Sequence, residues 1–211
     1  MLSNIKKVLV IAPHTDDGEF GCGGTINKLI KLGIEVHYVA YSACEQSVLP
    51  EFPKDILITE LKAATKELGI HPNNLHLLKF DVRTFNFKRQ EILDHMISFR
   101  NKYNPDLIFI PSLKDVHQDH FTIANEAVRA FKFKNILSYE MPWNNFDFNT
   151  CYFTILNKDN LSTKVNALKH YKSQKHRPYA SEEFIKSLAK VRGVQVGNEY
   201  AEVFEVVRII S

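Results

Sequence analysis

Histidines and aspartates gather in two short segments of the 211-residue chain. The first is PHTDDGE over residues 13–19, and the second is DVHQDH over residues 115–120. Each segment follows a short apolar run that is typical of a buried strand. In an open α/β sheet, the loops at the carboxyl ends of the strands form the ligand crevice. We therefore expect the two segments to meet at one crevice.

The side chains in these segments are of the types that bind a catalytic metal ion. A catalytic zinc usually takes three protein ligands and keeps one position for water, whose pKa the metal lowers to about 7. We predict that His14, Asp17 and His120 are these ligands. Zn²⁺ is the expected metal, and another divalent ion such as Fe²⁺ would fit the same donors.

Three further residues could fill the roles that hydrolysis of an amide by a metal-bound water requires. A carboxylate must accept a proton from water and later protonate the departing amine, and Asp16 beside the ligand Asp17 is placed for this role. An oxyanion then needs a donor already in position, preferably a protonated imidazole. His117 is the candidate donor, with Asp119 holding its charge and orientation.

Strand-like and helix-like segments alternate along the chain and predict the fold. Strands are expected at residues 7–12, 34–41, 75–80 and 106–111, and helices at residues 20–32, 56–68, 89–102 and 121–131. The last third is less regular, with strands at 136–139, 152–156 and 203–210 and helices at 161–171 and 181–191. We predict an α/β fold in one domain spanning residues 1–211, a Rossmann-like three-layer sandwich around a mostly parallel sheet. Residues 43–55 are the candidate mobile loop.

Composition excludes several classes of protein. The chain is 45% hydrophobic and 24% charged, as in ordinary globular proteins, and its net charge of +3 is too small to indicate a nucleic-acid binder. No stretch reaches the roughly 20 apolar residues of a transmembrane helix. Cys22, Cys44 and Cys151 are an odd number of cysteines at wide spacing, which suits neither a disulfide framework nor a Cys-x-x-Cys metal site, so we expect a cytoplasmic protein. A homo-oligomer is compatible with the sequence.

The two segments also resemble a known family. IAPHTDDGEFGCGGTI (residues 11–26) and DVHQDHFTIANEAVRA (residues 115–130) are similar to the two signatures of the PIG-L/LmbE-like deacetylases, and the likeness extends through residues 161–173 and 192–208. The resemblance implies a zinc-dependent enzyme that deacetylates an N-acetylglucosamine conjugate. It also implies metal ligands at His14, Asp17 and His120, a base at Asp16, and an oxyanion donor at His117 backed by Asp119.

Substrate contacts are less firmly indicated by the sequence. Arg83 and Tyr139 follow predicted strands, Asp81 matches a position that the family uses near the sugar, and Arg192 suits phosphate or sugar hydroxyls. The Arg177-Pro178-Tyr179 tripeptide suits the same groups. The chain departs from the family pattern at three positions. The family usually has proline where this chain has Thr15 and often has an acid where it has Gly18. Some members have tyrosine where it has Asp115.

Simpler or different interpretations stand beside this one. Asp17 and Asp119 could each only cap a helix. The glycines of residues 21–24 could indicate a nucleotide-binding Rossmann transferase or oxidoreductase, although the acids before them would repel a pyrophosphate and tight packing explains them better. A two-metal phosphoesterase and a non-catalytic sugar-binding module are further alternatives. Cys22 and the isolated histidines are assigned no role, and the lysines of residues 164–175 are expected to form a solvated face.

Overall fold

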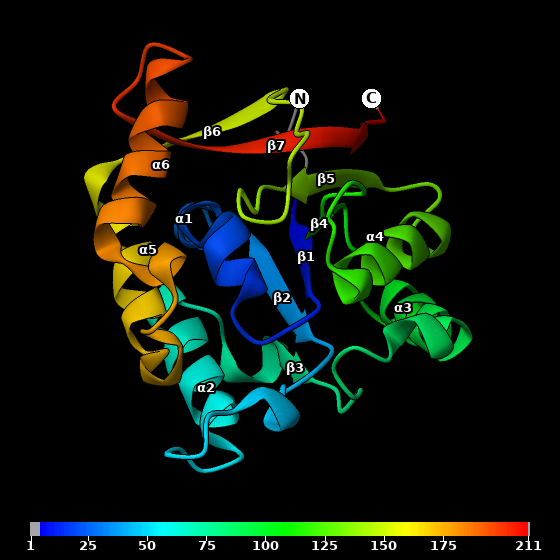
Figure 1. Ribbon diagram of the computed structural model, residues 1–211. Helices are drawn as coiled ribbons and strands as arrows, with labels where there is room; N and C mark the ends of the chain where they lie inside the picture. The colour runs from blue at the N-terminus through cyan, green and yellow to red at the C-terminus, as the bar shows by residue number, and fades with distance from the viewer. Residues whose placement is uncertain (1–4, 211) are drawn as a thin grey trace.

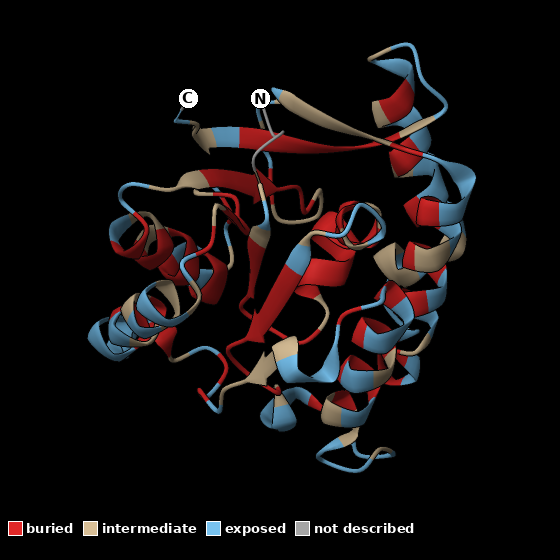
Figure 2. Cartoon of the chain, turned by 180° about the vertical axis from the view of Figure 1, so that it is seen from behind, coloured by how far each residue is buried: buried red, intermediate tan, exposed pale blue. Residues whose placement is uncertain are grey.

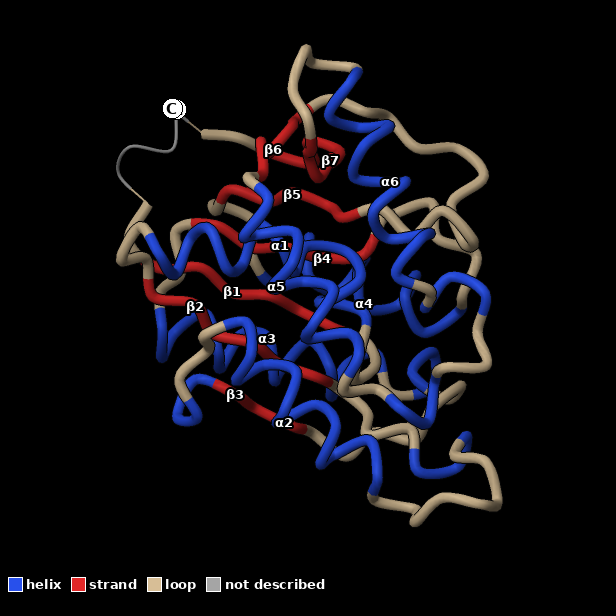
Figure 3. The backbone as a smooth tube through the Cα atoms, turned by 90° about the vertical axis from the view of Figure 1, so that its left-hand side faces the viewer, coloured by secondary structure: helices blue, strands red, loops and turns tan. Residues whose placement is uncertain are grey.

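The computed structural model describes residues 5–210, which contain one sheet in the order β3-β2-β1-β4-β5-β7-β6 (Figures 1 and 3). Five neighbouring strands run parallel: β1 (Lys7–Ala12), β2 (Glu35–Ala40), β3 (Leu75–Leu77), β4 (Leu107–Pro111) and β5 (Asn135–Tyr139). The last two, β6 (Tyr152–Leu156) and β7 (Tyr200–Arg208), add an antiparallel edge beside β5. The predicted mostly parallel sheet is therefore confirmed.

Helices cover both faces of this sheet (Figures 1 and 2). One face carries α1 (Asp17–Lys31), α2 (Ile56–Leu68), α5 (Lys158–Lys169) and α6 (Glu182–Val194), and the other carries α3 (Arg89–Tyr103) and α4 (Gln118–Ala130). Two separate apolar clusters fill the spaces between the sheet and the helices, which confirms the predicted three-layer sandwich. None of the described helices is long and apolar enough to cross a membrane.

The chain reverses its direction of winding between β1 and β4. The sheet grows from β1 toward β2 and β3 on one side, and toward β4 and β5 on the other, with Val8 opposite Leu107 and Val10 opposite Phe109. The loops that follow β1 and β4 consequently leave the same edge of the sheet at neighbouring positions. This is the topological switch point at which ligands bind in doubly wound folds.

Two helices begin earlier than the apolar periodicity predicts. The sequence indicates helix starts at Phe20 and Phe121, whereas α1 begins at Asp17 and α4 at Gln118. The first turns of both helices are made of polar and charged residues, so the periodicity that marks a buried apolar face is missing there. As a result, Asp17 and His120 lie on helices, close to the N-terminal ends of those helices, rather than in flexible loops.

Helix α1 is kinked at Cys22, whose φ of −146° and ψ of 22° are not helical. The glycines around the kink allow very close packing, because a Cβ on Gly21 would lie 2.3 Å from the ring of Tyr139, and a Cβ on Gly24 would lie 2.5 Å from Leu156. Tight packing therefore accounts for the glycine-rich segment. This is the explanation that the sequence favours over a dinucleotide-binding loop.

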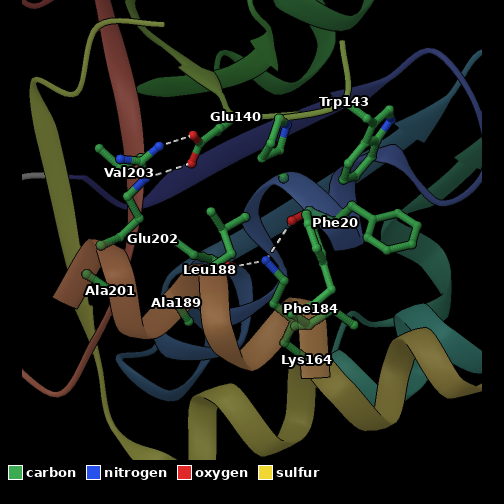
Figure 4. Close-up of a pocket in the computed structure, with 14 residues that line it drawn as sticks. Phe20, Glu140, Trp143, Lys164, Phe184, Leu188, Ala189, Ala201, Glu202 and Val203 are labelled. Atoms are coloured by element: carbon green, nitrogen blue, oxygen red, sulfur yellow. Dashed lines mark hydrogen bonds and ion pairs between the residues drawn. The ribbon is translucent and has the colours of Figure 1, made fainter. Parts of the chain in front are cut away.

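A buried ion pair satisfies the backbone groups near this kink (Figure 4). Nζ of Lys164 on α5 donates to the Phe20 carbonyl at 2.6 Å and to Glu202 of β7 at 2.7 Å. The Glu202 carboxylate in turn accepts the N–H groups of Gly24 and Thr25 at 3.0 and 2.6 Å. The prediction that the lysines of this region form a solvated face is therefore wrong for Lys164, whose side chain is buried.

Replacing Lys164 tests the importance of this ion pair. The Lys164→Met variant leaves the Glu202 carboxylate buried without its cation and should lower the free energy of unfolding by about 3–5 kcal/mol. Urea denaturation measures the loss. Lys169→Met on the same helix removes an exposed pair with Glu182 and should change stability far less than Lys164→Met does, because solvent screens the pair. Equal effects of the two variants would contradict a special role for the buried pair.

Candidate metal centre

Three donor atoms from His14, Asp17 and His120 lie close together at the switch point. Oδ2 of Asp17 is 3.1 Å from Nδ1 of His14 and 3.2 Å from Nε2 of His120. The two imidazole nitrogens are themselves 3.2 Å apart. A tetrahedral zinc site with bonds of about 2.0 Å has ligand-to-ligand edges of about 3.3 Å. The three side chains are thus arranged in a triangle of the size that such an ion needs.

His117 lies beside this triangle and offers an alternative third ligand. Ring nitrogens of His14, His117 and His120 all lie within 4.8 Å of one another. We favour the set with Asp17 because its distances are shorter and because a carboxylate offsets the charge of a divalent ion. Nδ1 of the His117 ring accepts the backbone N–H of Asp119 at 3.2 Å and caps α4.

The His117 cap contact fixes the tautomer of this ring. Since Nδ1 is an acceptor, the proton of the neutral imidazole is on Nε2. Burial and the imidazoles of His120 and His14 lower the pKa of His117 to about 4. The side chain is consequently a neutral N–H donor at pH 7, rather than the protonated imidazole that the sequence analysis prefers. A neutral imidazole can still donate to an oxyanion.

Two buried aspartates orient the rings of His14 and His120. Oδ2 of Asp115 lies 2.8 Å from Nδ1 of His120, and Oδ2 of Asp119 lies 3.1 Å from Nε2 of His14. Carboxylates in these positions select the tautomer that leaves the other nitrogen free for a metal. The sequence predicts that Asp119 holds His117, but the carboxylate of Asp119 contacts His14 instead. The role of Asp115 is not predicted from the sequence, although its position in the second segment, two residues before the first histidine, is a signal for such a carboxylate.

Arg83 contributes its backbone to the centre. Its N–H donates to Oδ2 of Asp119 at 2.6 Å, and its φ of 68° places the residue in the left-handed region, which is costly for a side chain other than glycine. The exposed guanidinium instead points to the hydroxyl of Ser47, 3.4 Å away. Arg83 therefore lies next to the site, but it contacts the site through its backbone N–H and not through its side chain.

Asp16 and Asp17 are adjacent in sequence but differ in environment. Asp16 occupies the N-cap position of α1, yet its carboxylate makes no capping hydrogen bond and faces the crevice. Burial and the neighbouring Asp17 charge raise the pKa of Asp16 to about 6. Burial would also raise the pKa of Asp17, but His120 and His14 hold it well below its usual range. One carboxylate is thus suited to proton transfer and the other to ligation.

The crevice above these residues is an open cavity of about 270 Å³. Its outer wall is aromatic: the rings of Trp143 and Tyr179 stack at 3.9 Å with an angle of 7°, and Phe20 meets both rings edge-on. Arg177 also lines the cavity, as the sequence analysis anticipates for this tripeptide. Nothing in the sequence indicates Trp143, because its loop has no motif.

The structure does not bring the other three predicted substrate contacts into this crevice. The hydroxyl of buried Tyr139 donates to the Ile11 carbonyl at 3.0 Å, so this side chain belongs to the core. Asp81 accepts a hydrogen bond from Gln46 beside a neighbouring hollow. Arg192 pairs with Glu140 in a second cavity of about 20 Å³, which shares Phe20 and Trp143 with the crevice (Figure 4).

The sequence matches the PIG-L family, described as GlcNAc-PI de-N-acetylase, over residues 9–132. Because the match covers more than half of the chain, the protein belongs to this family. It is 27% identical over 176 residues to a deacetylase of Escherichia coli K12, YaiS, whose own activity is uncharacterised. That alignment covers 80% of this chain and 91% of the relative.

Solved structures share the fold across nearly the whole chain. N,N'-diacetylchitobiose deacetylase from Pyrococcus horikoshii has a TM-score of 0.82 at 24% identity, covering 98% of this chain and 85% of that one. The 4-carboxy-2-hydroxymuconate hydratase GalB from Pseudomonas putida KT2440 has a TM-score of 0.78 at 20% identity, covering 98% and 99%. Since a deacetylase and a hydratase share this fold, the fold alone does not select the reaction.

Removing the carboxylate behind His120 tests the arrangement of the centre. The Asp115→Ala variant should bind Zn²⁺ about 10–100-fold more weakly, because the His120 ring loses the acceptor that orients it. Competition with a chromophoric chelator measures the affinity. Asp147→Ala is the matched control, since Asp147 is an exposed acid that pairs with Lys114. Unchanged affinity in Asp115→Ala would show that His120 needs no such support.

Proposed function

We propose that this protein is a zinc-dependent hydrolase that removes the acetyl group from an N-acetylglucosamine-type sugar conjugate. The observation that carries the proposal is the combination of three ligand atoms 3.1–3.2 Å apart with an uncapped carboxylate at Asp16 on the same crevice. Membership of the PIG-L family supports it.

The proposed reaction follows from the positions of the side chains. His14, Asp17 and His120 would hold the metal, which when bound supplies Lewis acidity toward water and the amide carbonyl. Asp16 accepts a proton as the water oxygen bonds to the acetamide carbon. The Nε2–H of His117 donates to the oxyanion that forms. Asp16 then returns the proton to the nitrogen as the C–N bond breaks, which releases acetate and a free amine.

The crevice supports a sugar as the substrate. Its aromatic wall at Trp143 and Tyr179 can pack against the apolar face of a pyranose ring, while Arg177 and Gln174 offer polar groups to hydroxyls or an anionic substituent. The family description names a GlcNAc conjugate, and the structural neighbour from Pyrococcus horikoshii is named for an acetylated chitobiose. Both support an N-acetylglucosamine unit as the acetyl donor.

The alternatives receive less support from this geometry. A two-metal phosphoesterase needs a second set of ligands about 3.5–4 Å from the first ion. The carboxylates of Asp115 and Asp119 are already hydrogen-bonded to His120 and His14, which leaves Asp16 as the one further acid on this crevice among the described residues. A non-catalytic sugar-binding module would be expected to lose the base or the oxyanion donor, and both Asp16 and His117 line the crevice.

An acetate-release screen tests the proposed function directly. Purified protein should contain about one zinc or similar divalent ion per chain and should release acetate from a panel of N-acetylglucosamine conjugates. Treatment with a chelator should abolish release, and added Zn²⁺ should restore it. Two metal ions bound with comparable affinity, together with hydrolysis of phosphate esters, would instead favour the phosphoesterase.

The neighbouring aspartates provide a selective test of the proton-transfer role. Asp16→Asn keeps the shape of the side chain but removes its basicity, so kcat should fall by at least about 10²–10⁴-fold while zinc content stays unchanged. Asp17→Asn weakens a ligand and should lower zinc affinity as well. Turnover measured alongside metal analysis separates the two effects. Near-wild-type turnover by a fully metallated Asp16→Asn protein would make Asp16 a structural residue.

A further inference from the structure

A buried acid that the proposed mechanism does not use lies beneath the crevice. Glu19, on the first turn of α1, is completely buried. Two tyrosine hydroxyls contact its carboxyl group: that of Tyr171, which follows α5, lies 2.8 Å from Oε1, and that of Tyr38 on β2 contacts Oε2. Three separate elements of the fold therefore meet at this side chain.

The same two hydroxyls also contact the backbone of residues 13–19, the segment that contains His14, Asp16 and Asp17. The Tyr171 hydroxyl contacts the carbonyl oxygen of Thr15, and the Tyr38 hydroxyl lies 3.4 Å from it. Thr15 lies between the proposed ligand His14 and the proposed base Asp16. The Thr15 carbonyl belongs to the peptide group whose nitrogen is that of Asp16, so its orientation affects the direction of the Asp16 side chain.

Counting the available protons gives one hydrogen-bond pattern that satisfies every close contact. Each tyrosine hydroxyl carries one proton, yet Tyr171 lies against two oxygens, the Thr15 carbonyl and Oε1 of Glu19. If Tyr171 donates to Thr15, it must accept from Glu19, and Tyr38 then donates to the other Glu19 oxygen. Every close contact is satisfied when Glu19 serves as both a donor and an acceptor.

Gly18 makes room for this arrangement. A Cβ at this position would lie 2.5 Å from the ring of Tyr38, so a larger residue would displace the tyrosine. The Gly18 N–H also donates to the Tyr38 hydroxyl at 3.2 Å. The missing side chain at residue 18 therefore leaves the space in which the Tyr38 ring lies, and this position lets the Tyr38 hydroxyl contact Glu19.

We propose that Glu19, Tyr38 and Tyr171 form a positioning cluster that fixes the Thr15–Asp16 peptide and thereby directs the Asp16 carboxylate toward the reacting water. This inference rests on the proposed function, because it assigns a purpose to the position of the base. The cluster itself touches neither the metal ligands' donor atoms nor the crevice. Its three members act through Asp16, since an error of about 1 Å in a catalytic group is enough to slow a reaction about 100-fold.

Three variants of the metal-loaded protein test the positioning cluster. Tyr171→Phe removes the hydroxyl that holds Thr15, so kcat should fall by about 10–100-fold while KM and metal content stay unchanged. Glu19→Gln should retain most of the wild-type kcat, because the amide N–H donates to Tyr171 and the amide oxygen accepts from Tyr38. Tyr41→Phe is the matched control, since Tyr41 is also buried but its hydroxyl has no hydrogen-bond partner within residues 5–210, and the ring packs on the opposite face of the sheet.

Crystal structures of metal-bound wild-type protein and Tyr171→Phe give a readout that needs no substrate. The Thr15–Asp16 peptide should move by more than about 0.5 Å in the variant, which exceeds the tolerance of a catalytic arrangement. An unmoved peptide, an unchanged kcat in Tyr171→Phe, or a loss of activity in Glu19→Gln equal to that in Asp16→Asn would each overturn the proposal. If wild-type protein released no acetate from any conjugate, the proposed function would fail, and the peptide displacement would still decide whether the cluster positions Asp16.

Discussion

The parallel pairing of β1 with β4 is the constraint on which the site depends. It places residues about a hundred positions apart within hydrogen-bonding distance, because the loops after two adjacent parallel strands leave the sheet at the same edge. The short connection from each strand to its helix then fixes Asp17 on α1 and His120 on α4. Side chains on the first turn of a packed helix have little freedom, so the donor atoms of Asp17 and His120 keep their spacing, and the backbone N–H of His14 is held by Oδ2 of Asp17 at 2.8 Å.

The centre concentrates charge that would be costly to bury without compensation. Asp17, Asp115 and Asp119 all lie inside the protein, and each accepts hydrogen bonds from an imidazole or a backbone N–H group. This mutual pairing offsets the desolvation of the carboxylates. It also favours one tautomer of His14 and one of His120, so the groups that stabilise the folded centre also orient the rings that we propose as metal ligands.

A second set of buried polar contacts supports the segment that carries Asp16. Lys164 and Glu202 satisfy the backbone where α1 kinks, while Glu19 and its two tyrosines contact the backbone just before the helix begins. Tyr38 and Tyr171 therefore contact the backbone before the first turn of α1, and Lys164 and Glu202 contact the backbone after it. A rigid support of this kind is what a proton-transfer group needs, since its position relative to the substrate determines its effectiveness.

The local sequence determined the alternating elements, the sheet type and the two segments that supply the site, because apolar periodicity and residue type report directly on strands, helices and donor chemistry. Only the tertiary structure decided which residue supports which. Asp119 contacts His14 rather than His117, Asp115 orients His120, and Tyr139 is a core residue rather than a wall of the crevice. Trp143, Lys164 and Tyr171 gain their roles through contacts with residues far away in the chain. Such pairings depend on strand order, helix kinks and packing between layers, which no local pattern of residues encodes.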